Sequence, residues 1–567
     1  VVGGVGGWAA GVAGRGEWIG DWSLHLATVR AAALSPLAPE DPLVGGYVPS
    51  PYFSPYTLLL AVITRLSGLA PETVLAAAGV VNVGLLLWGV RVLSRRLGDR
   101  TATAVLAVAF VLLLWGTRPF AWSGFAPVVS LSFTQSYPST MALALMPLCL
   151  AAFLRFRDEG RRADLALLTV LPALMLLIHP FTAAETAFVA AAFVLARPSA
   201  WPASRSLALA CACAGALALA ALWPYADMSG LVWAGPDFSR IHSLLVAHAF
   251  TKYWLVLVGV PALWHGVRLR LPLGRELVAA FAGGAVLVIV AVLLGRYEFT
   301  RLIPAIALMS HLALARHLGE RPARAPESLT RPDPGRLGRL PAFAKGRLGR
   351  LPGVAMGRSG RLSGVAMGRS SRLPGVVTGR FGRFPAVVVG RDGRFPEVVV
   401  GWFGRVLVGA VGRRSYGVVV AVACVIGLYG AVPGLARGLP AELSAGFAPA
   451  RTIDRWPGVR VRHSGDFARP YVREGDVVMV SGIGVARRLA GWGVRAVAPP
   501  YPYPFVPDEA ERRAAQSRMF AAETPPGERL LLADRYGVRC VLATRPLEVP
   551  GFVQVVTAGK RRLLCRP

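Results

Sequence analysis

Apolar residues in this chain are grouped in long runs, and not at the alternating positions that mark a half-buried strand. Nine such runs lie within the first 320 residues, and a tenth lies near the middle of the second half. Their lengths approach the roughly 20 residues that an α-helix needs to cross a bilayer. The sequence therefore predicts membrane-spanning helices. They are expected at 74–92, 102–116, 138–155, 164–178, 183–196, 205–223, 252–267, 276–294, 301–316 and 416–436.

The loops between these runs alternate in charge. Arginine-rich loops follow the first, third, fifth and seventh runs, whereas loops 117–136 and 224–251 are longer, aromatic and poor in arginine. Because basic loops are retained in the cytoplasm, we expect the aromatic loops outside, together with the N-terminal acidic loop and the C-terminal region. The run 57–70 contains Arg65 and ends in Ser-Gly, which predicts an interfacial or re-entrant helix.

The composition excludes an ordinary soluble globular protein. The 567-residue chain is 54% hydrophobic and 16% charged with a mean hydropathy of +0.51, whereas soluble domains are about 25% charged. Usage of Arg, Ala, Gly and Val is heavy, which is typical of a bacterium with a high genomic GC content. The Gly-rich residues 1–14 fit either the tail of a membrane helix whose start is missing or a flexible leader.

Residues 318–415 differ from the rest of the chain. Arginine recurs every eleven residues from Arg339 to Arg405, and each repeat carries Gly, often with Pro. These residues break helices, so the sequence predicts a disordered cytoplasmic loop and not a right-handed coiled coil. The basic residues either reflect only the positive-inside rule, with no further role, or bind anionic lipid headgroups. Nucleic acid is not an expected partner, since no aromatic platform accompanies the charge.

Residues 437–567 are predicted to form an extracytoplasmic α/β domain. Strands are expected at 476–480, 494–498, 538–543, 552–557 and 561–565, and helices at 508–522 and 528–536. Whether Cys540 and Cys565 pair is left open by the sequence. The other four cysteines lie in apolar runs, where they are expected to pack as small apolar side chains. No Cys and His spacing predicts a zinc site.

Candidate chemistry begins in the loop 16–56, ahead of the first strongly apolar run. It carries Glu17, Asp21 and His25, and a Pro- and aromatic-rich segment that includes Tyr52 follows. Asp21 and His25 are four residues apart and would share one face of a helix. A carboxylate beside a bound sugar can take a proton from an acceptor hydroxyl. Asp21 is therefore the candidate catalytic residue.

Two further polar clusters fall at the predicted outer ends of membrane helices. His179 opens the sequence His-Pro-Phe-Thr, and Arg296, Glu298 and Arg301 belong to Arg-Tyr-Glu-Phe-Thr-Arg. Charged residues at membrane depth are costly and tend to be functional. Arginine pairs can bind a phosphate through several N–H donors. The predicted topology places both clusters on the same side as Asp21.

These segments resemble the GT-C superfamily of polytopic membrane glycosyltransferases found in actinobacteria. The resemblance rests on GDWSLHLATVR at 20–30 with the aromatic loop after it, LIHPFTA at 177–183, RYEFTRLIP at 296–304 and LLADRYGVRCVL at 531–542. It implies that a sugar passes with inversion from a polyprenyl-phosphate donor to a cell-envelope glycan, lipid or protein acceptor. Asp21 would be the general base, and Arg296 and Arg301 would bind the donor phosphate.

Each candidate residue also has a structural interpretation. Asp21 can cap a helix, His25 can pack as a neutral ring, and His179 can satisfy backbone groups freed by the proline after it. Tyr52 can anchor at the membrane interface, and the Arg296, Glu298 and Arg301 side chains can form an interfacial cluster. Glu17 and the pair Glu40–Asp41 are expected to be solvated loop acids.

Together these features predict a mainly α protein, a polytopic transmembrane bundle of about ten or eleven helices in a bacterial plasma membrane. Its parts are expected to be a first loop (1–56), the bundle (57–317), the basic loop (318–415), a last helix (416–436) and the C-terminal domain (437–567). A transporter or flippase for a lipid-linked glycan, and a non-catalytic membrane scaffold, are the alternative functions. No cofactor is assigned, and a divalent cation is left open.

Overall fold

The computed structural model describes residues 2–15, 20–98, 100–226, 236–320, 413–439, 466–499, 506 and 508–567. Glu17, the eleven-residue repeats and the lipid contacts expected of the repeats lie outside the described residues. The described part is mainly α, with a helical bundle and a C-terminal five-stranded sheet, as predicted.

The bundle contains α1 (Val2–Arg15), α4 (Pro71–Ser94), α5 (Thr101–Leu113), α7 (Pro138–Glu159), α8 (Arg162–Ile178), α9 (Pro180–Ala196), α10 (Ala203–Ala221), α14 (Gly274–Leu293), α15 (Ile303–Gly319) and α17 (Arg413–Ala436). Within the described ranges, six helices are long and apolar enough to cross a membrane: α4, α7, α10, α14, α17, and α15 with the 3₁₀ turn η4 (Tyr297–Leu302) before it. The polytopic membrane bundle expected from the apolar runs is confirmed.

One predicted span, 252–267, is broken into three pieces. They are α12 (Ala249–Tyr253), the 3₁₀ turn η3 (Trp254–Gly259) and α13 (Val260–Arg268). Pro261 lies in the first turn of α13, where its missing N–H does no harm and where it starts a new helix. Gly259 is in close contact with Ser310 of α15 and has no room for a side chain. The prediction of one continuous helix here was wrong because backbone packing fixes the break.

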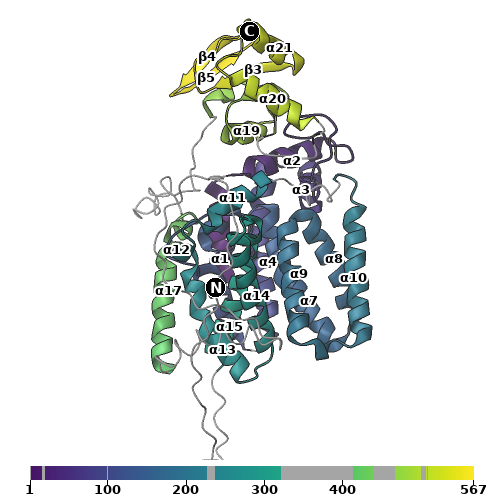
Figure 1. The fold of residues 1–567 in the computed structure, drawn as a ribbon, viewed down its shortest axis with the longest axis vertical. Helices are drawn as coiled ribbons and strands as arrows, with labels where there is room; N and C mark the ends of the chain where they lie inside the picture. The colour runs from purple at the N-terminus through teal and green to yellow at the C-terminus, as the bar shows by residue number, and fades with distance from the viewer. Residues whose placement is uncertain are drawn as a thin grey trace, which may run out of the picture. The chain divides into compact units, whose positions relative to one another are not determined.

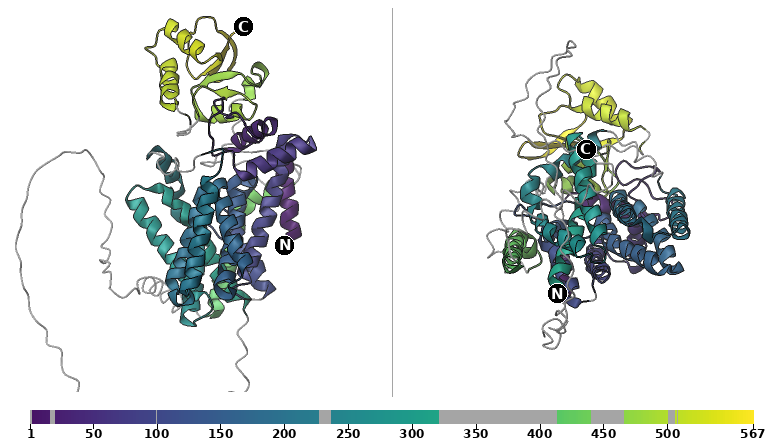
Figure 2. Two further views of the ribbon diagram at one scale, coloured as in Figure 1. Left: turned by 90° about the vertical axis from the view of Figure 1, so that its right-hand side faces the viewer. Right: turned by 60° about the horizontal axis from the view of Figure 1, so that its bottom comes forward.

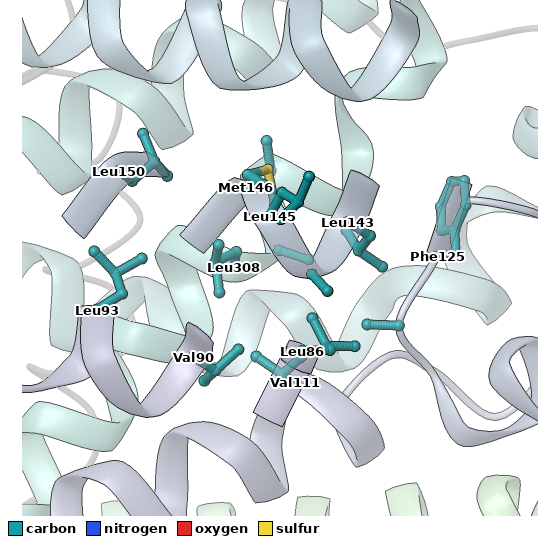
Figure 3. Packing of buried hydrophobic residues seen from close by; sticks show 14 of the residues in the cluster. Leu86, Val90, Leu93, Val111, Phe125, Leu143, Leu145, Met146, Leu150 and Leu308 are labelled. Atoms are coloured by element: carbon teal, nitrogen blue, oxygen red, sulfur yellow. The ribbon is translucent and has the colours of Figure 1, made fainter. Parts of the chain in front are cut away.

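The helices lie side by side (Figure 1; Figure 2, left), and buried apolar side chains pack between them. Helix α4 packs on α7, α7 on α8, α8 on α10, α5 on α15, and α14 on both α9 and α15. Figure 3 shows Leu86 and Val90 of α4 beside Val111 of α5 and Met146 of α7. Small residues let membrane helices approach closely. At Gly89 of α4 an added Cβ would lie 2.8 Å from Pro147 Cγ of α7.

The Gly-rich residues 2–15 belong to this bundle as helix α1. The helix packs against α4, and the Trp8 Nε1–H donates to the Gly434 carbonyl of α17 at 2.9 Å. Of the two interpretations that the sequence left open for this segment, the structure favours a helix and not a flexible leader.

The bundle has two chemically different ends. At one end, which we call the basic face, α7 ends and α8 and α14 begin, and the arginine-rich loops lie there. Two buried acids are paired at this face: Asp164 with Arg155 at 2.6 Å, and Glu276 with Arg157 at 3.2 Å. The opposite end, where α4, α7 and α9 begin, we call the site face.

Helices α2 (Trp22–Leu34) and α3 (Pro55–Ser67) lie at the site face and pack against each other. Trp22 and Leu26 of α2 join the bundle core, while Leu24 and Ala27 pack against Leu43, Val44 and Ala490. Both faces of α2 are therefore buried, as expected of a helix that is apolar nearly all round. Ser54 caps the start of α3 by accepting the Thr57 N–H, and α3 ends at Gly68 in the left-handed conformation.

The C-terminal sheet consists of β1 (Val477–Val480), β2 (Arg495–Ala496), β3 (Val538–Ala543), β4 (Val553–Ala558) and β5 (Arg561–Cys565), in the order β2-β1-β3-β5-β4. The β1 strand pairs in parallel with β2 and β3, and β5 pairs antiparallel with β3 and β4. All five strands, and helices α20 (Glu509–Phe520) and α21 (Pro526–Arg535), fall where the sequence predicted them. Helix α19 (Ile483–Ala490) was not predicted.

Alternation along β1 fills two apolar layers. Val478 and Val480 pack with Val485 and Leu489 of α19 on one face, and Met479 packs with Met519 of α20 on the other. Helices therefore cover both faces of the sheet. The question of cysteine pairing that the sequence left open is answered, because Cys540 of β3 lies opposite Cys565 of β5 and the two form a disulfide.

The C-terminal region contacts the N-terminal loop through backbone and side chains. The Ala496 N–H of β2 donates to the Leu43 carbonyl at 2.7 Å, and an Arg30 Nη1–H of α2 donates to the Gly491 carbonyl at 3.0 Å. Arg495 forms an ion pair with Glu40. Segments more than 400 residues apart in sequence thus meet at the site face.

Replacing both disulfide cysteines, as Cys540→Ala with Cys565→Ala, is expected to destabilise the sheet by about 3 kcal/mol, because the 25-residue loop is no longer closed in the unfolded chain. Amide hydrogen exchange in β3 and β5, measured by mass spectrometry, should accelerate about 100-fold. The exposed Cys211→Ala variant serves as the control. Unchanged exchange in the double variant would contradict the prediction.

Candidate functional site

A cluster of polar side chains lies at the site face, where the starts of α2, α7 and α9 approach η4. Its members come from five separate segments of the chain, and we call them the polar cluster. They are Asp21, His25, Trp122, Tyr137, Ser139, His179, Glu185 and Arg301.

Asp21 occupies the N-cap position of α2. Gly20 before it adopts a φ of +62°, and the Asp21 carbonyl accepts the backbone N–H groups of Leu24 and His25 at 2.9 and 3.1 Å. The carboxylate makes no cap hydrogen bond. Instead its Oδ1 accepts from Arg487 Nη1 of α19 at 2.8 Å, and 39% of the side chain is exposed. Asp21 is thus a partly open carboxylate directed away from its own helix.

His25 lies one turn further along α2 and is buried between two tyrosines. Its ring meets Tyr137 edge-on at 4.8 Å and Tyr52 at 6.0 Å, measured between ring centroids. Burial lowers the pKa of His25 to about 4, and the nearby Asp21 carboxylate offsets this only in part. The ring is therefore neutral near pH 7. The Tyr137 hydroxyl in turn bonds to backbone N–H groups of Asp21 and Trp22, which ties α7 to α2.

His179 ends α8 and caps α9. Its Nδ1 accepts the Thr182 N–H at 3.4 Å and lies 2.8 Å from Thr182 Oγ1, with Pro180 at the first helical position. Burial, together with the positive charge of Arg301, lowers the pKa of His179 well below its ordinary value. In a neutral ring whose Nδ1 accepts, Nε2 carries the proton. His179 Nδ1 therefore has the structural role of satisfying backbone groups at the start of α9, while Nε2 is a hydrogen-bond donor.

Arg301 is the buried cation of the polar cluster. Its Nη1 donates to the Ser123 carbonyl at 2.5 Å, and the guanidinium lies 5.5 Å from the Trp122 ring centroid and 5.1 Å from that of Phe181. These contacts fix the plane of the group. Arg301 is 9% exposed. Its Nε–H has no partner among the described residues.

Gly124 marks the point at which three of these side chains converge. An added Cβ there would lie 3.4 Å from His179 Cε1, 3.5 Å from Arg301 Nη1 and 4.0 Å from Ser139 Cβ. Gly124 also has a φ of +79°, which a side chain would disfavour. A residue without a side chain therefore keeps the space between His179, Ser139 and Arg301 open.

Glu185 was missed by sequence reasoning. It lies in the second turn of α9, is 1% exposed, and interacts electrostatically with Arg301 without forming an ion pair with it. The signal was present, since Glu185 is the one acid in the apolar run 180–196. Arg487 was also missed, because nothing in the sequence links a helix of the C-terminal region to a residue near the beginning of the chain.

The other two residues of the Arg-Tyr-Glu motif lie apart from this arrangement. Glu298 Oε1 accepts from Arg296 Nε at 2.5 Å, and Glu298 Oε2 bonds to Ser239 Oγ of α11 (Pro236–Val246) at 2.5 Å. The Arg296 side chain is 65% exposed. Arg296 and Glu298 thus join η4 to α11, and the structure brings only Arg301 of this motif to His179.

The expectation that Asp41 is a solvated loop acid was wrong. Asp41 is 1% exposed, and its Oδ1 accepts the backbone N–H groups of Leu43 and Val44 at 2.8 and 3.0 Å. This turn holds the loop that meets β2. Its neighbour Glu40 is partly exposed but paired with Arg495, so both acids serve the contact with the C-terminal region.

Several buried polar atoms of the cluster have no hydrogen-bond partner within the described part of the chain. They are His25 Nδ1, Trp122 Nε1, Ser139 Oγ, Glu185 Oε2 and Arg301 Nε. Leaving such a group unsatisfied costs about 1–3 kcal/mol unless water or a ligand bonds to it. The described part holds twelve further atoms of this kind outside the cluster, so the significance of the five lies in their being close together. Three of the five atoms are N–H or O–H donors, and one carries a full positive charge. This set favours a ligand with an anionic group.

Metal ligands do not gather here. Among the described residues, no three His, Cys, Asp or Glu side chains lie close enough together to hold a metal ion. The divalent cation that the sequence left open therefore receives no ligand set from these residues, and no chemistry is assigned to one.

Acidification is expected to unfold the region around His25. The unfolded imidazole binds a proton near pH 6.5 and the folded one only near pH 4, so stability is lost as the pH falls between these values. Between pH 7.5 and 5.0 the wild type should lose about 2 kcal/mol more than His25→Gln. Hydrogen exchange in α2 at both pH values measures this. The exposed His248→Asn variant is the control, and an equal loss in His25→Gln would contradict the prediction.

Comparisons with known proteins give matches among solved structures. No known protein family and no curated protein matches the sequence. Among solved structures, the cryo-EM structure of the arabinofuranosyltransferase AftD from Mycobacteria is similar, with a TM-score of 0.49 and 16% sequence identity. The match covers 98% of this chain and 40% of that chain, so this chain spans two fifths of the length of AftD. At this TM-score nothing about the chemistry of this chain follows from AftD.

Proposed function

We propose that this protein is a membrane glycosyltransferase of the GT-C type. It transfers a sugar from a polyprenyl-phosphate donor to a cell-envelope acceptor at the site face, which we place outside the cell. The observation that carries this proposal is the partly exposed Asp21 carboxylate, which interacts electrostatically with Arg301 at the end of a membrane bundle, where several buried donors have no partner among the described residues.

We place the donor phosphate beside Gly124. Arg301 Nε–H, Trp122 Nε1–H and Ser139 Oγ–H are buried donors without partners among the described residues. A charged guanidinium binds a phosphate oxygen through a short, charge-assisted bond, and the ring stacking and the bond to Ser123 hold it in place. We take this phosphate to belong to an amphiphile, because the site lies at the end of a membrane bundle. The polyprenyl chain of such a donor can extend into the lipid beside the bundle.

Asp21 serves as the general base in this mechanism. The acceptor hydroxyl oxygen forms a bond to the anomeric carbon of the donor sugar while the bond from that carbon to the phosphate oxygen breaks. The electron pair leaves with the phosphate, and the hydroxyl proton passes to Asp21. A positioned base contributes about 10²–10⁴-fold to such a step. Attack from the side opposite the leaving phosphate inverts the anomeric carbon.

The C-terminal region contributes to the same site through Arg487. Its guanidinium holds Asp21 Oδ1 at 2.8 Å, and Gly491 at the end of α19 lies against Ser23 of α2. An acceptor that reaches Asp21 therefore passes beside α19. We infer that this region binds the acceptor.

Asp21→Asn is expected to lower kcat by about 10³-fold, because the amide cannot take the acceptor proton. Release of polyprenyl phosphate from radiolabelled polyprenyl-phosphate sugars by the purified protein in lipid nanodiscs measures this. Asp466→Asn is the matched control, since Asp466 pairs with Arg488, the next residue of α19, at 3.0 Å. The control variant should retain wild-type turnover.

Two results would overturn the proposal. Full turnover by Asp21→Asn would exclude Asp21 as the base. Movement of the intact sugar-lipid across a vesicle membrane, with no transfer of the sugar, would instead identify a flippase.

A further inference from the structure

Glu185 is a buried acid for which the proposed reaction has no role. It lies on α9 within the apolar part of the bundle, 1% exposed, and its Oε2 has no hydrogen-bond partner among the described residues. The hydroxyl groups nearest to it along α9 are already used: Thr182 Oγ1 faces His179 Nδ1 at 2.8 Å, and Thr186 Oγ1 donates to the Thr182 carbonyl at 2.7 Å.

The buried acids at the basic face are different. Asp164 and Glu276 are equally buried, and each forms an ion pair with an arginine, although Asp164 Oδ2 also has no hydrogen-bond partner among the described residues. Such pairing is what a buried carboxylate requires when it has only a structural role. Arg301 interacts electrostatically with Glu185 without forming an ion pair with it, and its Nη1 donates instead to the Ser123 carbonyl. Glu185 Oε2 and Arg301 Nε are both buried and have no partner among the described residues.

The chemistry of the two groups selects different parts of one ligand. Arg301 attracts an anion, whereas a carboxylate repels one and accepts hydrogen bonds only from a donor such as a hydroxyl. A side chain on a helix is inclined towards the helix N-terminus, so Glu185 reaches back towards the His179 end of α9. A phosphate with a neutral polyol attached satisfies both groups at once.

We propose that Glu185 binds a hydroxyl of the donor sugar while Arg301 binds the donor phosphate, so that Glu185 determines which sugars are accepted. This inference rests on the proposed function and adds a specificity residue to it. A hydrogen bond from a sugar hydroxyl to a carboxylate is of the charge-assisted kind, and its loss weakens binding by about tenfold or more.

The test compares two ligands that differ only in the sugar. Affinities of the purified full-length protein in nanodiscs are measured for polyprenyl phosphate alone and for polyprenyl-phosphate sugars, of which the tightest-binding one is used. Glu185→Gln should raise the Kd of the sugar-bearing lipid about tenfold and leave the Kd of the sugar-free lipid unchanged. Arg301→Gln should weaken both.

Monodeoxy versions of the donor sugar identify the hydroxyl. The wild type should bind one of them about tenfold more weakly than the parent, and Glu185→Gln should bind the two equally. Coupling of this kind shows direct contact between the side chain and the missing group. A role for Glu185 in folding alone would not produce it.

Two further variants keep the test decisive. Glu185→Asp retains the charge on a shorter side chain and should raise the Kd of the sugar-bearing lipid only, even if Glu185→Gln fails to fold. Glu276→Gln removes a buried acid at the basic face and should lower thermal stability without changing either Kd. It therefore reports the effect of losing a buried carboxylate away from the site.

The outcomes separate the two proposals. If the wild type binds both lipids but the Glu185 variants weaken both equally, or neither, the sugar role of Glu185 is overturned and the proposed function stands. If the wild type binds no polyprenyl phosphate with or without a sugar, the proposed function fails and the inference fails with it.

Discussion

The cost of burying polar groups at the end of a membrane bundle governs this structure. At the basic face two buried carboxylates form ion pairs: Asp164 with Arg155, and Glu276 with Arg157. Around Gly124 the same rule is not met, since Glu185 and Arg301 lie near each other with unpartnered atoms in the described part of the chain. The buried acids at the basic face form ion pairs with arginines, whereas Glu185 and Arg301 form none with each other, and this difference favours a ligand that binds between them.

Helix α2 makes this arrangement possible because both of its faces pack against other parts of the protein. Trp22 and Leu26 anchor it in the bundle, and Leu24 and Ala27 pack against the layer that includes Ala490. The first turn of α2 therefore has a fixed position between two bodies of structure. Asp21 at its start has little freedom to move, which would keep the proposed base at a fixed distance from the proposed phosphate-binding groups. Such preorganisation is the main contribution of a protein to group transfer.

Much of this could be predicted from sequence, for physical reasons that also explain what could not. Long apolar runs and strand-like runs are local signals, so nine of the ten apolar runs formed helices and all five strands fell where expected. Convergence of Asp21, His179 and Arg301 followed from topology, because an even number of crossings separates them. Arg487 could not be found this way, since its contact with Asp21 depends on tertiary packing across 466 residues. The prediction of a solvated Asp41 was wrong because the short side chain of an aspartate can accept hydrogen bonds from nearby backbone N–H groups. A sequence does not distinguish this arrangement from a solvated side chain.

Two independent features bear on which face lies outside the cell. The arginine-rich loops lie at the basic face, and basic loops are retained in the cytoplasm. The C-terminal region contacts α2 through Arg487 and Gly491 and so belongs to the site face, and it carries the Cys540–Cys565 disulfide. Disulfides persist in oxidising compartments and are rare in the cytoplasm. Loop charge and cysteine chemistry are independent signals, and both favour a site face that lies outside the cell. The proposed sugar transfer would then take place where polyprenyl-linked sugars meet the cell envelope.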